Sequence, residues 1–392
     1  MDMKQPVRGA LVVAVLLVLT ACKLTPAVPT DVAYNRATGW GQYLDPAPGR
    51  ALAMTPTATD VSYAAAGTTN ADMKFDLYVP TTPVSNGPRP LVIWFHGLGG
   101  TKASAEIAPA VRELFARGFV VVSANYTMNA AARGLPASTM LTQGKRLVRL
   151  LKVAAAVNGA ASPWNANRIY VAGISGGGYL ASMIGLTPGQ FEPTDAAVAS
   201  QTSAVAGVIG FQAPFDLTQM VNWASTNIAT PGVNLEVGII ESAVNTWFGC
   251  RLPARTTGIT LLLPKCDAPT QAALLQGLSP SSRVAASNPN TPFFLVTGSR
   301  DLVVQSVAQG KAFSDALTAR NTAANVGDGS AWTDLVGANH GANLAIPIYN
   351  DRLPNAGQFV PNSPLSSISM VHFLGFVGCL PNATSTAMNC LP

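Results

Sequence analysis

Charged residues are scarce in this sequence. Only 11% of its 392 residues are Asp, Glu, Lys or Arg, and the formal net charge is +5. The densest basic stretch comprises Lys145, Arg146, Arg149 and Lys152, and its helical spacing indicates a solvated helix face. Nucleic-acid sites need a denser basic patch interleaved with aromatic residues, so nucleic-acid binding is not expected.

Long apolar runs are also few. Residues 9–19 form one, and it follows the basic residues Lys4 and Arg8. A permanent transmembrane helix needs about 20 apolar residues, whereas a short run after a positive start is typical of a secretory signal. We therefore expect the protein to be exported.

The apolar run ends in Leu19-Thr20-Ala21-Cys22, which resembles the bacterial lipobox. The resemblance implies that residues 1–21 are a lipoprotein signal peptide and that the Cys22 sulfur is diacylated, which anchors the protein in the bacterial cell envelope without spanning the membrane. Lys23 follows, not the aspartate of an inner-membrane retention signal, so the outer membrane is favoured where the organism has one. An ordinary signal peptide cut near Ala21 is the alternative.

Four further cysteines follow in the chain, namely Cys250, Cys266, Cys379 and Cys390. An even number of cysteines in an exported protein predicts disulfides. Three pairings are possible, and sequence proximity favours Cys250–Cys266 with Cys379–Cys390. The spacing and the lack of nearby histidines do not favour zinc binding.

Residues 22–58 are rich in Pro, Gly, Ala and Thr and are interpreted as a tether with an irregular N-terminal segment. Residues 59–392 are interpreted as one domain, in which strand and helix patterns alternate. Predicted strands cover 60–67, 73–80, 91–97, 119–126, 168–175, 204–214, 292–299 and 331–337. Predicted helices cover 102–117, 138–158 and 177–186. This alternation predicts an α/β fold with a mostly parallel sheet and helices on both faces.

Residues 214–290 interrupt the alternation and separate two predicted neighbouring strands. They include Trp223, Trp247 and Phe248. A connection of this length is more often functional than idle, so we interpret it as a cap-like insertion over the end of the sheet. A peripheral elaboration is the alternative.

The stretch AGISGGGYLASM places Ser175 between a predicted strand and a predicted helix, with Gly173 and Gly177 at the spacing of G-x-S-x-G. A serine on a sharp strand-to-helix turn needs neighbours without Cβ atoms, because the backbone passes closely there. The motif alone is a weak signal in a chain with 35 glycines. Its context makes Ser175 a candidate nucleophile.

A serine nucleophile requires a base, and the chain has only three histidines. His340 follows the last predicted strand in a glycine-bracketed loop and is favoured. His372 lies in an apolar helical pattern and is interpreted as a packed residue. His96 ends a strand ahead of the serine.

The histidine in turn needs an acid that orients its ring. Asp301 comes directly after a buried strand and precedes His340, which gives the order Ser, Asp, His. The competitors Asp315, Asp328 and Asp334 do not follow a central strand.

Acyl transfer also needs amide donors for the developing oxyanion. The amide of Gly176, directly after the serine, is one candidate. Leu98, in the HGLGG stretch after a predicted strand, is the other. The alternative for this stretch is that His96-Gly97 is merely a strand-ending turn.

These motifs, in this order, resemble the α/β-hydrolases over about residues 60–350. FHGLGGTK is similar to the oxyanion segment of bacterial lipases, and NRIYVAGISGGGYLA and GSRDLVV…GANHG are similar to bacterial carboxylesterases and feruloyl-esterase-type enzymes. The resemblance implies Ser175 as nucleophile, His340 as base, Asp301 as acid, and Leu98 and Gly176 as oxyanion donors. Two features depart from the family. Gly176 stands where many members carry a larger residue, and the HGGG signature of one esterase branch is absent.

The sequence therefore predicts a serine esterase that hydrolyses small-molecule or polymeric carboxylic esters and needs no cofactor or metal. Two alternatives remain. One is a peptidase of the prolyl-peptidase type, which normally carries a propeller domain too large for the residues ahead of the oxyanion loop. The other is a surface lipoprotein that binds a partner without chemistry.

Overall fold

The computed structural model of the protein describes residues 54–67, 70, 72–81, 88–103, 114–115, 118–326, 330–335 and 340. Several predicted features lie outside the described residues, namely the signal peptide, the tether up to residue 53, Cys22, Asp328, His372, Cys379, Cys390 and most of the helix expected over 102–117. Among the described residues no helix is long and apolar enough to cross a membrane.

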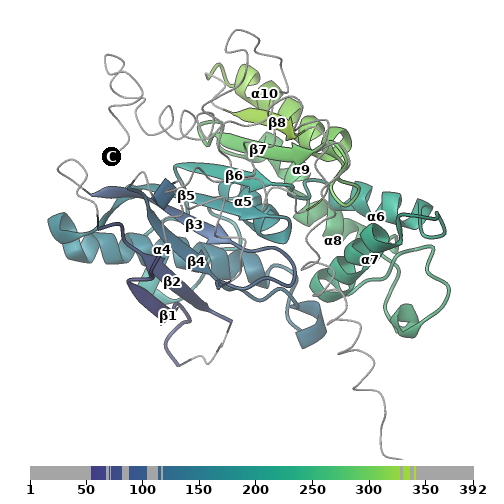
Figure 1. Cartoon of the computed structure of the whole chain (residues 1–392), viewed down its shortest axis with the longest axis horizontal. Coiled ribbons are helices and arrows are strands. Elements are labelled where there is room, and N and C mark those ends of the chain that lie inside the picture. The colour runs from purple at the N-terminus through teal and green to yellow at the C-terminus, as the bar shows by residue number, and fades with distance from the viewer. Residues whose placement is uncertain are drawn as a thin grey trace, which may run out of the picture.

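Eight strands of the described chain form one sheet in the order β1-β2-β4-β3-β5-β6-β7-β8 (Figure 1). Their bounds are β1 Ala58–Ser62, β2 Lys74–Tyr78, β3 Arg89–Phe95, β4 Val120–Ala124, β5 Trp164–Ile174, β6 Gly207–Phe211, β7 Phe293–Gly298 and β8 Ala331–Leu335. Strands β3 to β8 all pair in parallel with their neighbours among themselves, whereas β1 pairs antiparallel with β2 and β2 pairs antiparallel with β4. The mostly parallel sheet predicted from the sequence is confirmed.

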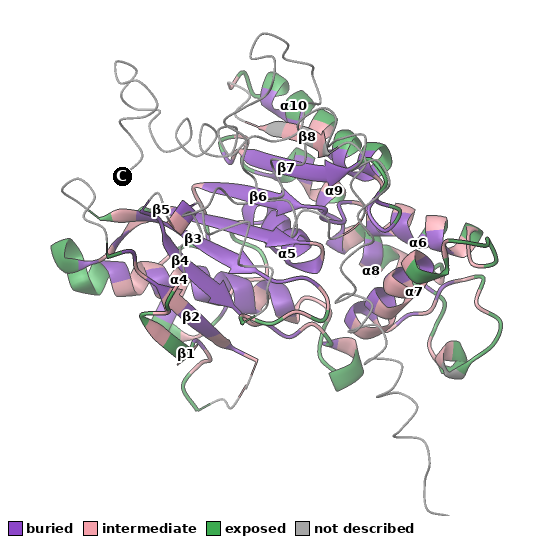
Figure 2. Cartoon of the chain, viewed as in Figure 1, coloured by how far each residue is buried: buried purple, intermediate pink, exposed green. Residues whose placement is uncertain are grey.

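The central strands are buried on both faces, as their continuous apolar runs predict (Figure 2). On β3, Leu91, Ile93 and Phe95 pack into one hydrophobic cluster, while Val92 and Trp94 pack into a second cluster. The alternation follows from the two-residue period of a strand. The core therefore lies on both sides of the sheet.

Three long helices flank the sheet, namely α4 (Thr139–Asn158), α5 (Gly176–Leu186) and α10 (Ala312–Ala323). Buried residues of all three contribute to the first of the two hydrophobic clusters. Helix α5 is buried along its whole length. Ser175 is the N-cap residue of α5, so the candidate nucleophile directly precedes a helix that is buried throughout.

The basic stretch on α4 is not the solvated face that the sequence predicts. Lys145 is fully buried and its Nζ lies 3.2 Å from Glu192 Oε1, while Arg146 lies 2.9 Å from Asp195. Arg149 lies 2.9 Å from Glu192 Oε2. The interpretation was wrong because the charged partners come from a loop about 45 residues away, which helical spacing does not reveal. Burial, opposed by Glu192, lowers the pKa of Lys145 to about 8.

A group of helices between β6 and β7 interrupts the alternation. It comprises α6 (Leu217–Thr226), α7 (Asn234–Ala243), the π-helix η5 (Val244–Phe248), the short helix η6 (Ile259–Leu262), α8 (Pro269–Leu278), α9 (Pro280–Arg283) and the short helix η7 (Val284–Ala286). Figure 1 shows α6, α7 and α8 gathered beyond one end of the strands. These elements occupy the stretch that the sequence analysis interprets as an insertion.

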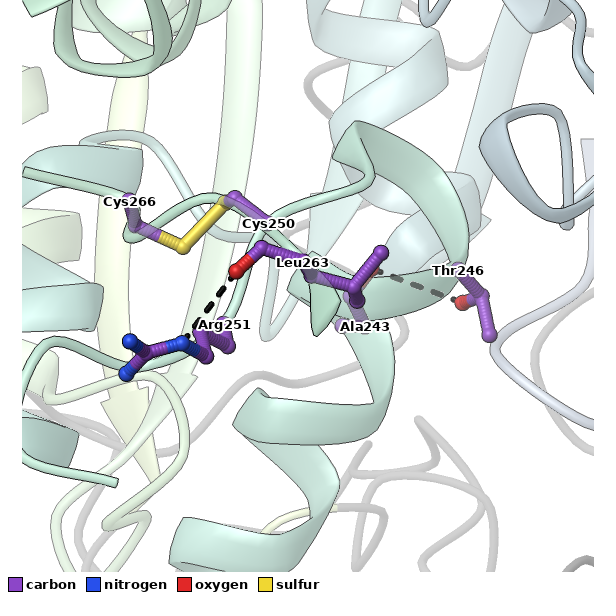
Figure 3. The surroundings of a disulfide bond; sticks show 6 residues. All are labelled: Ala243, Thr246, Cys250, Arg251, Leu263 and Cys266. Carbon is purple, nitrogen blue, oxygen red and sulfur yellow. Dashed lines mark hydrogen bonds between the residues drawn. A yellow bond between two sulfur atoms is a disulfide. The ribbon is translucent and has the colours of Figure 1, made fainter. Parts of the chain in front are cut away.

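A disulfide joins Cys250 to Cys266 within this insertion, with a Cα–Cα distance of 5.0 Å (Figure 3). Arg251 supports it, because its Nε donates to the Leu263 carbonyl at 3.2 Å. The disulfide closes a loop that begins just after η5. It is one of the two disulfide bonds that sequence proximity favours.

Candidate active site

Ser175 lies on a strained turn between β5 and α5. Its backbone has φ 51° and ψ −120°, a conformation that L-residues rarely adopt. The Ser175 amide donates to the Phe211 carbonyl of β6 at 2.9 Å, which fixes the turn to the sheet. This strand–turn–helix context is the one in which G-x-S-x-G carries meaning.

The glycines on either side of the serine have no room for a side chain. A Cβ at Gly177 would lie 2.0 Å from the Phe95 carbonyl oxygen. A Cβ at Gly173 would lie 2.4 Å from the Gly177 carbonyl carbon. Because these obstacles are backbone atoms that cannot move aside, both positions require glycine.

The structure brings His340 to Ser175 across 165 residues of sequence. The Nε2 of His340 lies 3.0 Å from Ser175 Oγ, and its Nδ1 lies 2.8 Å from Asp301 Oδ2. With Nδ1 as the donor to the carboxylate, Nε2 is free to accept a proton from the hydroxyl. The three side chains selected from the sequence thus form one hydrogen-bonded series.

Asp301 is fixed more firmly than an ordinary loop carboxylate. It follows β7 and is 2% exposed. Its Oδ1 accepts hydrogen bonds from the amides of Val303 and Val304 at 2.9 and 2.8 Å, which leaves Oδ2 for His340. The carboxylate is therefore held in one orientation.

The described competitors of Asp301 have other partners. Asp315 is an exposed residue of α10 and pairs with Lys311. Asp334, on the edge strand β8, accepts a hydrogen bond from Thr297 at 3.2 Å. Neither carboxylate contacts His340.

The two residues whose amides are expected to bind an oxyanion lie in segments next to Ser175, namely the loop after β3 and the first turn of α5. Gly97, next to Leu98, passes so closely that a Cβ there would be 3.4 Å from the serine Cβ. Gly176 is the first residue of α5, where the N–H has no acceptor within the helix. In the described part of the chain, neither the Leu98 nor the Gly176 amide donates a hydrogen bond.

Lys102 anchors the loop that carries Leu98, a role that the sequence analysis missed. Its Nζ lies 2.7 Å from Asp76 and 3.1 Å from Asp60. Burial disfavours its charged form, but the hydrogen bonds to the two carboxylates outweigh that effect and raise its pKa. Its carbonyl accepts from Ser123 Oγ at 2.8 Å. The loop is thus tied to β2 and β4.

His96 is a packed residue. It is 4% exposed, and its ring stacks on Tyr126 with centroids 4.8 Å apart. Its Nδ1 lies 2.9 Å from the Gly97 carbonyl oxygen. Burial lowers its pKa to about 4. Its described contacts are with the strand end and not with Ser175.

The insertion also contributes to the site. A Cβ at Gly176 would lie 2.5 Å from Cη2 of Trp247, on η5, and 3.0 Å from Cε of Met128. The indole therefore fills the space beside the nucleophile that a side chain at position 176 would take. The sequence offered one signal for this contact, namely a glycine directly after the serine. Because protein interiors are closely packed, the space that a larger side chain would take there must be filled by another residue.

No three His, Cys, Asp or Glu side chains of the described residues are grouped as a metal site would need. The polar side chains joined at Ser175 are a hydroxyl, an imidazole and a carboxylate. A serine nucleophile, a base and an orienting acid are the side chains that acyl transfer through a serine requires.

The sheet, the serine turn and the order of the three side chains define an α/β-hydrolase. The family model BD-FAE matches residues 75–317, which is more than half of the chain. The protein therefore belongs to the BD-FAE family and is an ester hydrolase by that membership.

Solved structures share the fold. One is a truncated form of a carbohydrate esterase from gut microbiota, with 19% identity and a TM-score of 0.52 over 74% of this chain and 91% of that chain. Another is a bifunctional GH43-CE of Bacteroides eggerthii, with 21% identity and a TM-score of 0.50 over 73% of this chain and 35% of that chain. No curated protein matches the chain at a significant level.

Proposed function

We propose that the protein is a serine esterase that acts through an acyl-enzyme, with Ser175 as nucleophile, His340 as base and Asp301 as orienting acid. One observation carries the proposal, namely the hydrogen-bonded series from Ser175 Oγ through His340 to Asp301. A lone hydroxyl is a poor nucleophile, and this arrangement supplies the base that activates it.

In the first half-reaction, Ser175 Oγ attacks the ester carbonyl carbon while its proton moves to His340 Nε2. The negative charge that develops on the carbonyl oxygen is stabilised by the amides of Leu98 and Gly176. The carbon–oxygen bond to the alcohol then breaks, and the alcohol leaves with the proton from His340. Asp301 stabilises the imidazolium that exists between these two transfers.

In the second half-reaction, a water molecule gives a proton to His340 and attacks the acyl carbon. The bond to Ser175 Oγ breaks and the serine recovers its proton. The products are one carboxylic acid and one alcohol, and the enzyme returns unchanged. These steps use the protein's own side chains and amides.

We propose further that the protein is exported to the bacterial cell envelope and anchored by lipid at Cys22, with residues 1–21 removed. The sequence motif supports this proposal, and so does the Cys250–Cys266 disulfide, because disulfides persist in oxidising compartments. Cells grown with tritiated palmitate should label the protein, and Cys22→Ala should lose the label. Equal labelling of both would contradict lipid attachment at this residue.

The esterase proposal is tested by covalent labelling. A fluorophosphonate should modify the full-length protein once, with the added mass on the peptide that contains Ser175. His340→Ala should be labelled at least about a hundredfold more slowly, because the base is removed. Absence of labelling in the folded protein would contradict the proposal and favour a binding role.

A further inference from the structure

Trp247 comes from the insertion yet lies against the turn that carries the nucleophile. Its Cη2 and Cζ2 atoms lie 2.5 and 2.7 Å from the position that a Cβ at residue 176 would occupy. The backbone at Gly176 is helical, with no positive φ, so the neighbour and not the backbone conformation excludes a side chain there. The indole edge therefore lies directly over the Gly176 main chain.

The indole is held by packing on several sides. It is 2% exposed and stacks on Tyr179 of α5, with ring centroids 6.1 Å apart and planes at 25°. Phe248 meets it edge-on at 6.1 Å. Cys250, two residues beyond Phe248, is joined to Cys266 and fixes the chain after the π-helix. The ring cannot easily move away from Gly176.

The indole N–H has no hydrogen-bond partner among the described residues. The contacts described for the indole are therefore packing contacts. Met128 also approaches the Gly176 position, at 3.0 Å, but through the end of a flexible side chain. On the side of the serine next to Gly176, Trp247 is thus the rigid neighbour and Met128 is the flexible one.

We infer that Trp247 limits the size of the acyl group that Ser175 accepts. The inference rests on the proposed esterase function. In the proposed acyl-enzyme the acyl carbon is bonded to Ser175 Oγ and its oxygen points to the Gly176 amide, so the first atoms of the acyl group lie close to residue 176. Trp247 occupies space at that residue. The insertion thereby supplies the specificity element that a larger residue 176 would otherwise provide.

The test compares kcat/KM for p-nitrophenyl acetate and hexanoate in the full-length protein. Replacing Trp247 with Leu or Phe should raise the hexanoate-to-acetate ratio at least tenfold, because a few methylenes in an apolar pocket change discrimination by that much. Trp223→Leu is the matched control, since Trp223 lies on α6 of the same insertion and the atoms nearest to the Gly176 position belong to Trp247 and Met128. It should leave the ratio within twofold of wild type.

A second pair of variants tests the contact itself. Gly176→Ala should lower kcat/KM for acetate at least tenfold, although alanine is the better helix former. The double variant Gly176→Ala with Trp247→Leu should recover to within threefold of Trp247→Leu alone. Thermal melting of each variant identifies any that fail to fold, and rescue of the melting temperature in the double variant reports the contact independently of activity.

An active, folded Trp247→Leu or Trp247→Phe protein with an unchanged hexanoate-to-acetate ratio would overturn the inference about Trp247. It would leave the proposed esterase function untouched. Failure of the double variant to recover would also overturn it. A wild-type protein that hydrolyses no ester would instead overturn the proposed function, and this inference with it.

Discussion

Asp301 and His340 lie 39 residues apart in sequence, yet Oδ2 of the one is 2.8 Å from Nδ1 of the other. The second carboxylate oxygen accepts two backbone amides, so only Oδ2 faces the imidazole. This contact determines which ring nitrogen carries the proton, and it leaves Nε2 facing Ser175.

Asp301→Asn should lower kcat for ester hydrolysis by about 10³- to 10⁴-fold without unfolding the protein, because an amide cannot stabilise the imidazolium and favours the wrong tautomer. The exposed Asp315→Asn is the control and should retain full activity. Steady-state hydrolysis and circular dichroism of both variants check this. Near-normal kcat in Asp301→Asn would assign the orienting role to another group.

Gly177→Ala should destabilise the protein by about 3 kcal/mol or more, because its Cβ would overlap the Phe95 carbonyl oxygen and the nucleophile turn would have to shift. Gly238→Ala is the matched control. Gly238 lies on α7 with nothing within 4 Å of the added Cβ, so the change should stabilise by up to about 1 kcal/mol. Urea denaturation measures both. Equal stability of the two variants would contradict the packing described at the turn.

His96 should make the fold sensitive to acid. Its pKa is about 4 in the folded protein against 6.5 when unperturbed. Between these two pH values, the unfolded chain binds a proton at His96 that the folded chain does not bind. Stability should therefore fall as pH drops from about 6.5 to 4, by about 3 kcal/mol from this group. In His96→Asn the same pH interval should cost about that much less. Parallel pH dependences of the unfolding free energy would show that His96 is not the origin.

Glu192→Gln should lower the free energy of unfolding by about 3 kcal/mol, because it leaves the buried Lys145 and the half-buried Arg149 without their carboxylate. The exposed pair of Lys311 and Asp315 offers the comparison, since Asp315→Asn should cost about 0.5 kcal/mol or less. Urea titrations of both variants measure the two losses of unfolding free energy. A small effect of Glu192→Gln would mean that the other acceptors of the Lys145 ammonium, the Thr187 carbonyl and Ser203 Oγ, are sufficient for it.

The candidate site could be predicted from the sequence because its members follow strand ends. Parallel strands bring their carboxyl ends to one edge of the sheet, so the residues directly after the strands at Ser175 and Asp301 meet there. His340 was the remaining histidine in a suitable loop.

The contacts that the sequence analysis missed join segments far apart without a local pattern. Lys145 reaches Glu192 and Lys102 reaches Asp76, and helical spacing carries no information about either partner. Trp247 was noted within the insertion, but only the fold brings it to Gly176. Packing complementarity of this kind depends on the whole fold and not on local preference.

The most direct test of the account is hydrolysis of p-nitrophenyl acetate by the full-length protein and by its Ser175→Ala variant. We predict that the wild type hydrolyses the ester with saturation kinetics, and that Ser175→Ala loses at least about 10³-fold in kcat while it keeps the wild-type melting temperature. Undiminished hydrolysis by a folded Ser175→Ala protein would contradict the assignment of Ser175 as the nucleophile.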